Sequence, residues 1–122
     1  MKLVSIGEAS RRTGLSIETL RFYEREGLTP GPVARDAAGR RAYSEEDLEW
    51  LLMTARLRLT QMPISRIRRY ADLVRQGASS IPERLDLLAD HERAVRAQIA
   101  ELQSALAAID QKVADYRMAA TA

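Results

Sequence analysis

The sequence predicts an all-α fold with a small β wing, in which a winged helix-turn-helix is followed by a long coiled-coil dimerisation helix. Three patterns support this fold class: two short capped helical segments around a glycine, a stretch rich in proline and glycine over residues 28–43, and an unbroken heptad pattern over residues 81–116. A chain of 122 residues is long enough for one compact domain and one extended element, but not for two full-sized domains. We therefore expect a first domain over residues 1–76 and a dimerisation helix over residues 81–118.

The first two helices are predicted from their caps. The run Ser5-Ile6-Gly7-Glu8 has the pattern of a capping box and predicts a helix over residues 6–12, which ends before Gly14. Ser16 is placed to cap a second helix over residues 17–25. Two short helices joined by a turn that contains glycine are typical of a helix-turn-helix.

The next segment is predicted to be a wing. Pro30, Gly31, Pro32 and Gly39 surround two short runs, over residues 33–35 and 40–43. Such runs, bounded by turn residues, favour short strands over helix. We expect a two-stranded hairpin.

Two more helices should follow the wing. Ser44 is a helix cap followed by three carboxylates at the positive end of the helix dipole, and Pro63 breaks the chain before the next helix. The third helix is expected to bury a stripe made of Leu48, Leu51, Leu52, Ala55 and Leu59. The fourth helix should end near Gly77. Its apolar face is expected to consist of Ile64, Ile67, Ala71 and Val74. The opposite face, which is either solvated or in contact with phosphates, carries Arg66, Arg68, Arg69 and Arg75.

A heptad seam covers the last third of the chain. Apolar residues recur at alternating spacings of four and three from Ile81 to Tyr116, with Glu92 as the single polar member, which either fixes the register or faces water. A helix this long, roughly 54 Å at ~1.5 Å per residue, cannot fold back on so small a domain, so the seam needs a second chain, although its first heptad should pack on the protein's own third and fourth helices. The expected dimerisation residues are Leu88, Val95, Ile99, Leu102, Leu106, Ile109 and Val113.

Positive charge is concentrated in the first part of the chain. Residues 1–70 hold thirteen Lys and Arg against nine Asp and Glu, whereas residues 71–122 hold six against eight. Nearly all of the basic residues are arginine, the side chain suited to planar recognition of phosphates and guanine edges. This distribution favours an anionic polymer as the partner of the first part, while the arginine content alone fits codon usage in a GC-rich genome equally well.

Several function classes are excluded by composition. The chain has no cysteine, which excludes disulfides, thiolate nucleophiles and thiolate metal sites. His91 is the single histidine, and no serine has a histidine and an acid arranged around it, so we expect no enzyme activity, no cofactor and no metal. Apolar runs are only a few residues long and no signal peptide is evident, which predicts a soluble, cytoplasmic protein without a membrane partner.

Several motifs together resemble the MerR family of bacterial transcription regulators, over essentially the whole chain. These are Ile6-Gly7-Glu8-Ala9, Thr13-Gly14-Leu15-Ser16, the specific run from Thr19 through Arg21-Phe22-Tyr23-Glu24 to Gly27-Leu28, Arg40-Arg41-Ala42-Tyr43-Ser44, and Asp47-Leu48. The resemblance implies a homodimer held by antiparallel pairing of the last helices. It also implies a palindromic site on double-stranded promoter DNA that the dimer bends and untwists, so that RNA polymerase can read both promoter elements. A DNA-organising or protein-interaction adaptor that regulates no promoter is the alternative.

The resemblance also suggests residue roles. Thr19 and Arg21 lie at the exposed start of the recognition helix and are expected at base edges, while the Tyr23 hydroxyl is expected at a phosphate. In the wing, convergent guanidinium groups match the spacing of phosphates along DNA. Of the two adjacent arginines, Arg40 and Arg41, one is expected to point away from the DNA. The full set of expected DNA-binding residues is Arg12, Ser16, Thr19, Arg21, Tyr23, Arg35, Arg40, Arg41 and Tyr43.

The effector is not determined by the sequence. Within the family, further residues are similar to the NmlR and AdhR branch: Leu48-Glu49-Trp50-Leu51, Met62-Pro63-Ile64, Glu83-Arg84-Leu85 with Leu88 and His91, and Lys112 with Tyr116. Members of that branch are thought to sense aldehyde and nitrosative stress through one cysteine in the third helix, where this chain has Arg56. Arg56 is expected either to pair with a carboxylate and hold that helix in one state or to bind an anionic ligand. The signal binds in a crevice between the third, fourth and fifth helices, or the chain responds to none. His91 is either a pH or metal contact or an ordinary surface residue.

Overall fold

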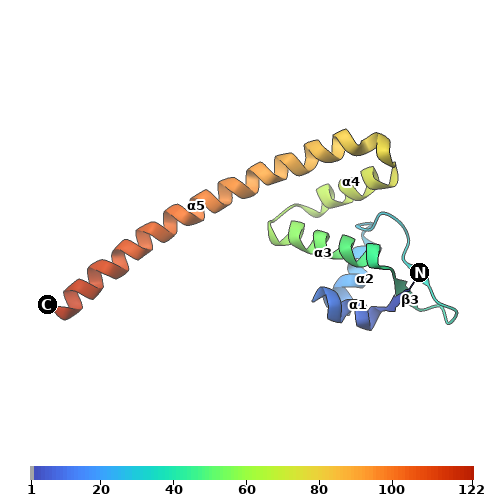
Figure 1. Ribbon diagram of the computed structural model, residues 1–122, viewed down its shortest axis with the longest axis horizontal. Coiled ribbons are helices and arrows are strands. Elements are labelled where there is room, and N and C mark those ends of the chain that lie inside the picture. The colour runs from blue at the N-terminus through green and yellow to red at the C-terminus, as the bar shows by residue number, and fades with distance from the viewer. Residues whose placement is uncertain (1) are drawn as a thin grey trace. The chain divides into compact units, whose positions relative to one another are not determined.

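The computed structural model describes residues 2–122, which divide into two compact units, one ending at Leu85 and one spanning Asp86–Ala122 (Figure 1). The fold is mostly helical with a small antiparallel sheet, as the sequence predicts. The elements in chain order are β1 (Val4–Ser5), α1 (Ile6–Thr13), α2 (Ile17–Arg25), β2 (Ala34–Arg35), β3 (Arg41–Tyr43), α3 (Glu45–Leu59), α4 (Ile64–Arg75), the short 3-10 helix η1 (Ala78–Ser80) and α5 (Ile81–Thr121).

Helices α1 and α2 form the predicted helix-turn-helix. The Ser5 hydroxyl accepts the backbone N–H of Glu8 at 3.1 Å, and the Ser16 hydroxyl accepts that of Thr19 at 3.1 Å. Gly14 takes a left-handed conformation with φ of 74° and donates its N–H to the carbonyl of Ser10, which ends α1. The caps therefore fix both helices where the sequence places them.

The expected two-stranded hairpin is present as β2 and β3, but a third strand, β1, extends it to a three-stranded sheet. Strand order is β1-β3-β2, with Val4 opposite Tyr43 and Arg35 opposite Arg41. Strand β1 has only two residues, and the second of them, Ser5, is also the N-cap of α1. Two residues are too few to show a period, which is why the sequence pattern did not reveal this strand. Pairing of β1 with β3 ties the start of the chain to the hairpin.

Helix α3 buries a different stripe from the one expected. Its capping box is present, because Ser44 and Asp47 exchange hydrogen bonds at 3.1 and 2.9 Å. The buried residues follow one another at intervals of three, and Leu59 at the end of the helix is 81% exposed. The chain turns away after Leu59, so that Met62 enters the core in its place. The buried members are Leu48, Leu51, Thr54 and Leu57.

Helix α4 folds back along α3 (Figure 1) and completes the core of the first unit. It buries Ile67 and Ala71 as expected, together with Leu73, while Val74 is only half-buried. The buried Ser80 of η1 donates its hydroxyl to the carbonyls of Leu73 and Gly77, which closes the turn that leads into α5.

Helix α5 carries the heptad seam on its surface. Ile81 and Leu85 are 54% and 66% exposed, so the expectation that the first heptad packs on α3 and α4 is wrong for these two residues. Leu87 is buried instead. Glu92 is exposed, and its Oε2 lies 3.6 Å from a terminal nitrogen of Arg96, one turn further along the same helix. The exposed apolar members of the seam include Ile99, Leu102, Leu106, Ile109, Val113 and Tyr116.

Across the described residues 2–122, no helix is both long enough and apolar enough to cross a membrane.

Candidate nucleic-acid interface

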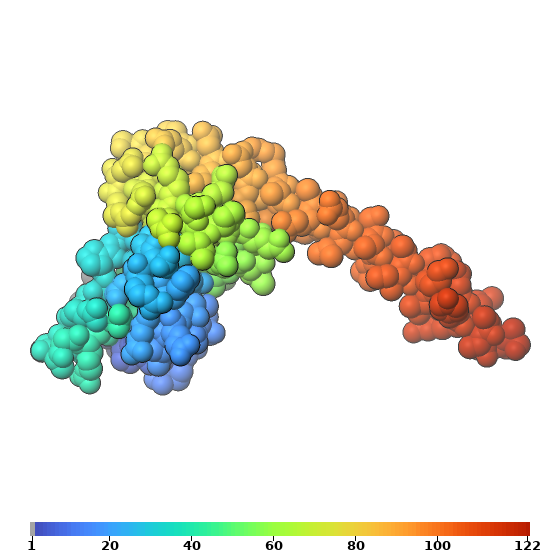
Figure 2. Space-filling model, turned by 180° about the vertical axis from the view of Figure 1, so that it is seen from behind, coloured from blue at the N-terminus to red at the C-terminus, as the bar shows by residue number. Residues whose placement is uncertain are grey.

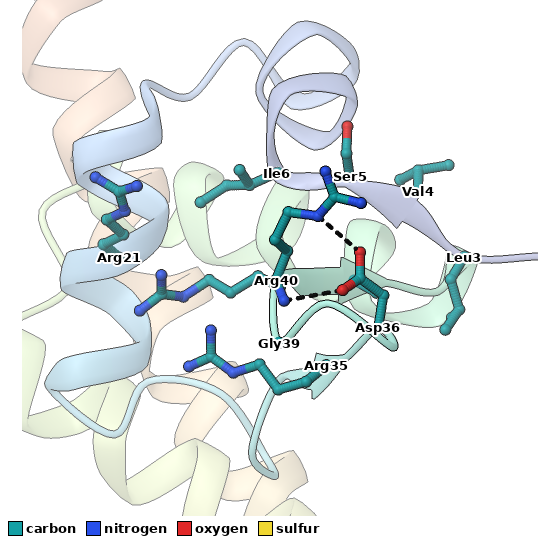
Figure 3. A pocket seen from close by; sticks show the side chains of 11 residues that line it. Leu3, Val4, Ser5, Ile6, Arg21, Arg35, Asp36, Gly39 and Arg40 are labelled. Carbon is teal, nitrogen blue, oxygen red and sulfur yellow. Dashed lines mark hydrogen bonds and ion pairs between the residues drawn. The ribbon is translucent and has the colours of Figure 1, made fainter.

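Four arginines line one groove between the recognition helix α2 and the wing (Figure 3). The groove has a volume of about 570 Å³. Arg21 comes from α2, Arg35 from β2, Arg41 from β3, and Arg40 from the turn that joins the two strands. The hairpin projects beyond the helices of its own unit (Figure 2), so this cationic surface is open to a large partner. The structure thus brings together four of the predicted DNA-binding residues.

Arg21 is the groove arginine without an acidic partner among the described residues. It is exposed on α2 and lies across the groove from Arg40 and Asp36 (Figure 3). The start of the same helix presents Ser16 and Thr19, whose hydroxyls are hydrogen bonded to each other at 2.9 Å. A guanidinium without an acidic partner, on the exposed face of a helix, suits a ligand that offers hydrogen-bond acceptors, such as the base edges in a DNA groove.

Glu24 connects the recognition helix to the wing. Its Oε1 accepts from Arg41 Nε at 3.0 Å and lies 3.5 Å from the guanidinium of Arg35. Arg35 and Arg41 are paired neighbours on β2 and β3, so one carboxylate of α2 holds both strands of the hairpin. Sequence reasoning assigned no role to Glu24, because nothing in the pattern shows which acid faces the wing.

The tip of the wing is organised by Asp36. Its Oδ1 accepts the backbone N–H groups of Ala38 and Arg40, each at 2.9 Å, and its Oδ2 accepts from Arg40 Nε at 3.1 Å. The backbone hydrogen bond from Arg40 is the main cause that holds the pKa of Asp36 below its usual range. Arg40 and Arg41 have different acidic partners, Asp36 and Glu24, and the Arg40 side chain remains 79% exposed. Both arginines nevertheless line the same groove, so the expectation that one of them points away from it is wrong; Arg40 lies in the turn before β3, where the alternation of a strand does not apply.

Arg12 is engaged outside the groove. Its two terminal nitrogens donate to the two carboxylate oxygens of Glu45, each at 2.7 Å. This hydrogen bond raises the pKa of Arg12 and lowers that of Glu45. The pair joins α1 to the start of α3, a structural role that the sequence did not indicate.

Two expected contacts are placed in the core. Tyr23 and Tyr43 are 5% and 2% exposed, and burial is the main cause that raises the pKa of both phenols. The Tyr43 hydroxyl is buried and has no hydrogen-bond partner in the described part of the chain. Both rings therefore belong to the core, and the buried position of the Tyr43 hydroxyl contradicts a surface contact from it. The phosphate contact expected of the Tyr23 hydroxyl stays a prediction.

One further cation on α2 was missed by the sequence reasoning. Arg25 follows Arg21 by one helical turn and lies over the ring of Phe22, 5.8 Å from its centroid. The spacing of four residues was the available signal, because residues so spaced share a helix face. Arg25 extends the positive face of the recognition helix.

Arg56 lies exposed on α3. Within residues 2–122 no carboxylate forms an ion pair with it, so the alternative in which Arg56 pairs with an acid finds no partner in this chain.

Comparisons with known proteins agree with this geometry. The family model described as MerR HTH family regulatory protein matches residues 4–73. An HTH-type transcriptional regulator of Haemophilus influenzae is 39% identical over 112 residues, which are 92% of this chain and 82% of that protein. The regulator AdhR of Bacillus subtilis is 34% identical over 90 residues, or 74% of this chain and 64% of AdhR.

Solved structures show the same relationship. The crystal structure of HiNmlR, described as a MerR family regulator lacking the sensor domain and bound to promoter DNA, matches with a TM-score of 0.88 and 37% identity, covering 97% of this chain and 93% of that one. A MerR family regulator from Listeria monocytogenes matches with a TM-score of 0.87 and 34% identity, covering 93% and 85%. The matched family model, the relatives and the helix-turn-helix with its wing lead to one conclusion: this chain belongs to the MerR family of transcriptional regulators, and it is a DNA-binding regulator rather than an enzyme.

Proposed function

We propose that the groove between α2 and the wing is the surface that binds promoter DNA. The observation that carries this proposal is the convergence of Arg21, Arg35, Arg40 and Arg41 on one open groove beside the recognition helix. The description of HiNmlR as bound to promoter DNA supports the same partner for this chain. An α-helix fits the major groove of B-DNA, and a hairpin beside it reaches the flanking backbone.

The contacts divide into two kinds. Arg21, with Thr19 and Ser16 beside it, contacts base edges, because it is exposed on α2 and free of an acidic partner in the described chain. The wing arginines contact phosphates, where a shared Glu24 lowers their net charge without covering the groove. Arg12 is a peripheral backbone contact that must share its charge with Glu45.

The protein acts as a homodimer through α5. The exposed part of the seam from Ile99 to Val113 leaves large apolar side chains in water, and burying each one fully contributes about 1.5–3 kcal/mol. A second copy presents the same seam in an antiparallel arrangement, which closes the pair with two-fold symmetry. Two recognition helices then read the two halves of a palindromic site.

Regulation follows from the rigidity of such a dimer. A coil that fixes the spacing of two recognition helices can impose a bend and an untwist on the promoter, at a cost of about 1–6 kcal/mol in DNA deformation. RNA polymerase then engages both promoter elements on the reshaped duplex. Because the partner is the bacterial chromosome, we place the protein in the cytoplasm.

A DNase footprint and a transcription assay on the same promoter test this function. We expect protection between the two promoter elements, with enhanced cleavage at the centre of the site where the duplex bends, and a change in run-off transcript when the protein is added. A DNA-organising or protein-interaction adaptor would give neither a defined footprint nor a change in transcript, and that pair of results would refute promoter regulation.

A further inference from the structure

Three backbone carbonyls that follow the recognition helix are each held by a side chain from α3 or α4. Arg68 Nε donates to the carbonyl of Glu26, Trp50 Nε1 to that of Leu28, and Arg75 to that of Thr29, all at 2.7 Å. Glu26, Leu28 and Thr29 belong to the short connection between α2 and the wing. The donors come from residues far along the chain, so these are tertiary contacts.

The geometry of this connection explains why it needs support. The last carbonyls of a helix lack partners within the helix, and Gly27 turns the chain with φ of 70° directly after α2. The Leu28 N–H donates to the carbonyl of Tyr23 at 2.9 Å, and the Leu28 carbonyl accepts from Trp50. Both backbone groups of Leu28 are therefore hydrogen bonded. Without the three donors, the connection would lose its fixed position relative to α3 and α4.

The donors are themselves fixed. Trp50 on α3 stacks on Tyr70 of α4, with ring centroids 5.1 Å apart and planes 20° from parallel. Arg68 reaches the Glu26 carboxylate at 3.2 Å as well as its carbonyl, and Arg75 pairs with Asp72 on its own helix. The helices α3 and α4 therefore present a rigid set of donors rather than mobile side chains.

We propose that Trp50, Arg68 and Arg75 are positioning residues for DNA recognition. They hold the end of the recognition helix and the start of the wing at a fixed spacing, so that Arg21 and the wing arginines meet the duplex together. The proposal rests on the proposed function, since it assumes that this groove binds DNA. It assigns Arg68 and Arg75 to backbone carbonyls of the protein, in place of the phosphate contacts that a basic helix face suggests.

Salt dependence separates the two roles. An arginine that contacts a phosphate releases a counterion when it binds, so its removal makes the plot of log Kd against log salt shallower by nearly one unit. A positioning arginine lowers affinity without changing that slope. Trp50 carries no charge, so its removal cannot change the salt slope by releasing fewer counterions. Trp50→Phe keeps one aromatic ring against Tyr70 and removes the donor together with the second ring of the indole.

The test compares Trp50→Phe, Arg68→Ala and Arg75→Ala with the control Arg66→Ala, an exposed arginine of α4 without an ion pair in the described chain. The probes are a duplex that the wild-type protein selects from a random library and a random duplex of equal length. We expect each of the three variants to bind the selected duplex roughly three- to tenfold more weakly, with a smaller loss on random DNA and an unchanged salt slope. Arg66→Ala should leave the ratio of the two affinities unchanged.

A shallower salt slope for Arg68→Ala and Arg75→Ala, or wild-type binding by Trp50→Phe, would overturn the proposal. Circular dichroism checks that the variants are folded, and Arg68→Gln and Arg75→Gln, which remove the charge and keep a polar side chain, replace any alanine variant that unfolds. Hydrogen exchange provides a readout without DNA: the amides of residues 27–35 should exchange faster in Trp50→Phe than in Arg66→Ala. If the wild-type protein selects no sequence from the random library, the proposed function fails. Equal amide exchange rates in Trp50→Phe and Arg66→Ala would show separately that the positioning role fails.

Discussion

Arg21 differs from the other three arginines of the groove because no carboxylate within residues 2–122 pairs with it. Arg35 and Arg41 share Glu24, and Arg40 is bound to Asp36. A guanidinium that is already neutralised by an acid gains less from a phosphate, whereas one that is free can donate both of its parallel N–H groups to a guanine edge. The residues of the groove are therefore unequal in what they can contribute to sequence recognition.

We predict that Arg21→Ala weakens binding to the selected duplex by about 1–3 kcal/mol and changes binding to random DNA little. The measurement is a titration of both duplexes by fluorescence anisotropy at the same salt concentration. Arg40→Ala is the matched comparison, because it removes another exposed cation of the same groove, at the tip of the wing, and should weaken binding to both duplexes alike. Equal losses for Arg21→Ala on the two duplexes would make Arg21 a phosphate contact.

Tyr43 provides a second residue-level prediction. Its hydroxyl is buried without a hydrogen-bond partner in the described chain, and such a group costs about 1–3 kcal/mol of desolvation. We expect Tyr43→Phe to leave the free energy of unfolding unchanged or to raise it by about 1 kcal/mol, as measured by urea denaturation. DNA affinity should stay at the wild-type value. A loss of affinity on both selected and random DNA would instead restore the phosphate contact that the sequence suggested.

At the scale of the elements, the sequence predicted helices better than strands because caps are local signals. Ser5, Ser16 and Ser44 each begin a helix within one residue of the expected place. Strand β1 and the burial of Thr54 depend on which surfaces meet in three dimensions, and no local pattern carries that information.

The candidate site shows the same division. The arginines of the wing could be predicted because arginine in a hairpin beside a helix-turn-helix has few other uses. Their engagement with Glu24 and Asp36 could not, since each pairing depends on the register of β2 against β3 and on the approach of α2. The burial of Tyr43 could not be predicted for a related reason: Ala42 and Tyr43 are adjacent in β3 and both are buried, so both sides of this short strand are covered by neighbouring elements, which no local pattern shows.

The turn between α3 and α4 permits a prediction at this scale. Gln61 has φ of 73°, the single positive value outside glycine in residues 2–122. A side chain in that region costs about 1–2 kcal/mol, while glycine adopts it freely but gives up more entropy on folding. We expect Gln61→Gly to raise the free energy of unfolding by up to about 1 kcal/mol in urea denaturation. The same change at exposed Arg66 inside α4 should lower it by about 1 kcal/mol, and similar effects at both positions would contradict the strain argument.

At the scale of the whole molecule, the absence of cysteine limits how the regulator can be switched. Addition to an aldehyde or nitrosation needs a thiolate, and the guanidinium group that Arg56 carries cannot replace a sulfur nucleophile in these reactions. We expect reporter transcription to be unaffected by formaldehyde, methylglyoxal or a nitric-oxide donor at doses that switch thiol-dependent regulators. The variant Arg56→Cys tests whether this position can sense at all. Fast induction of the wild-type protein would show that sensing does not require a thiol in this chain.

The proposed dimer gives the last prediction, because a single seam residue should control both assembly and DNA binding. Leu102 belongs to the exposed part of the seam and is 70% exposed in the single chain. Leu102→Asp would place one carboxylate per chain in the buried interface, at a cost of about 4 kcal/mol or more, which corresponds to at least a thousandfold weaker association. We expect sedimentation to show a monomer at micromolar concentration, with binding to the palindromic site lost and weak binding to one half-site retained. Ser104→Asp adds the same charge two residues away, outside the seam, and should remain dimeric. A wild-type protein that sediments as a monomer under these conditions would refute pairing through α5, and a dimeric Leu102→Asp variant would move the interface elsewhere on the chain.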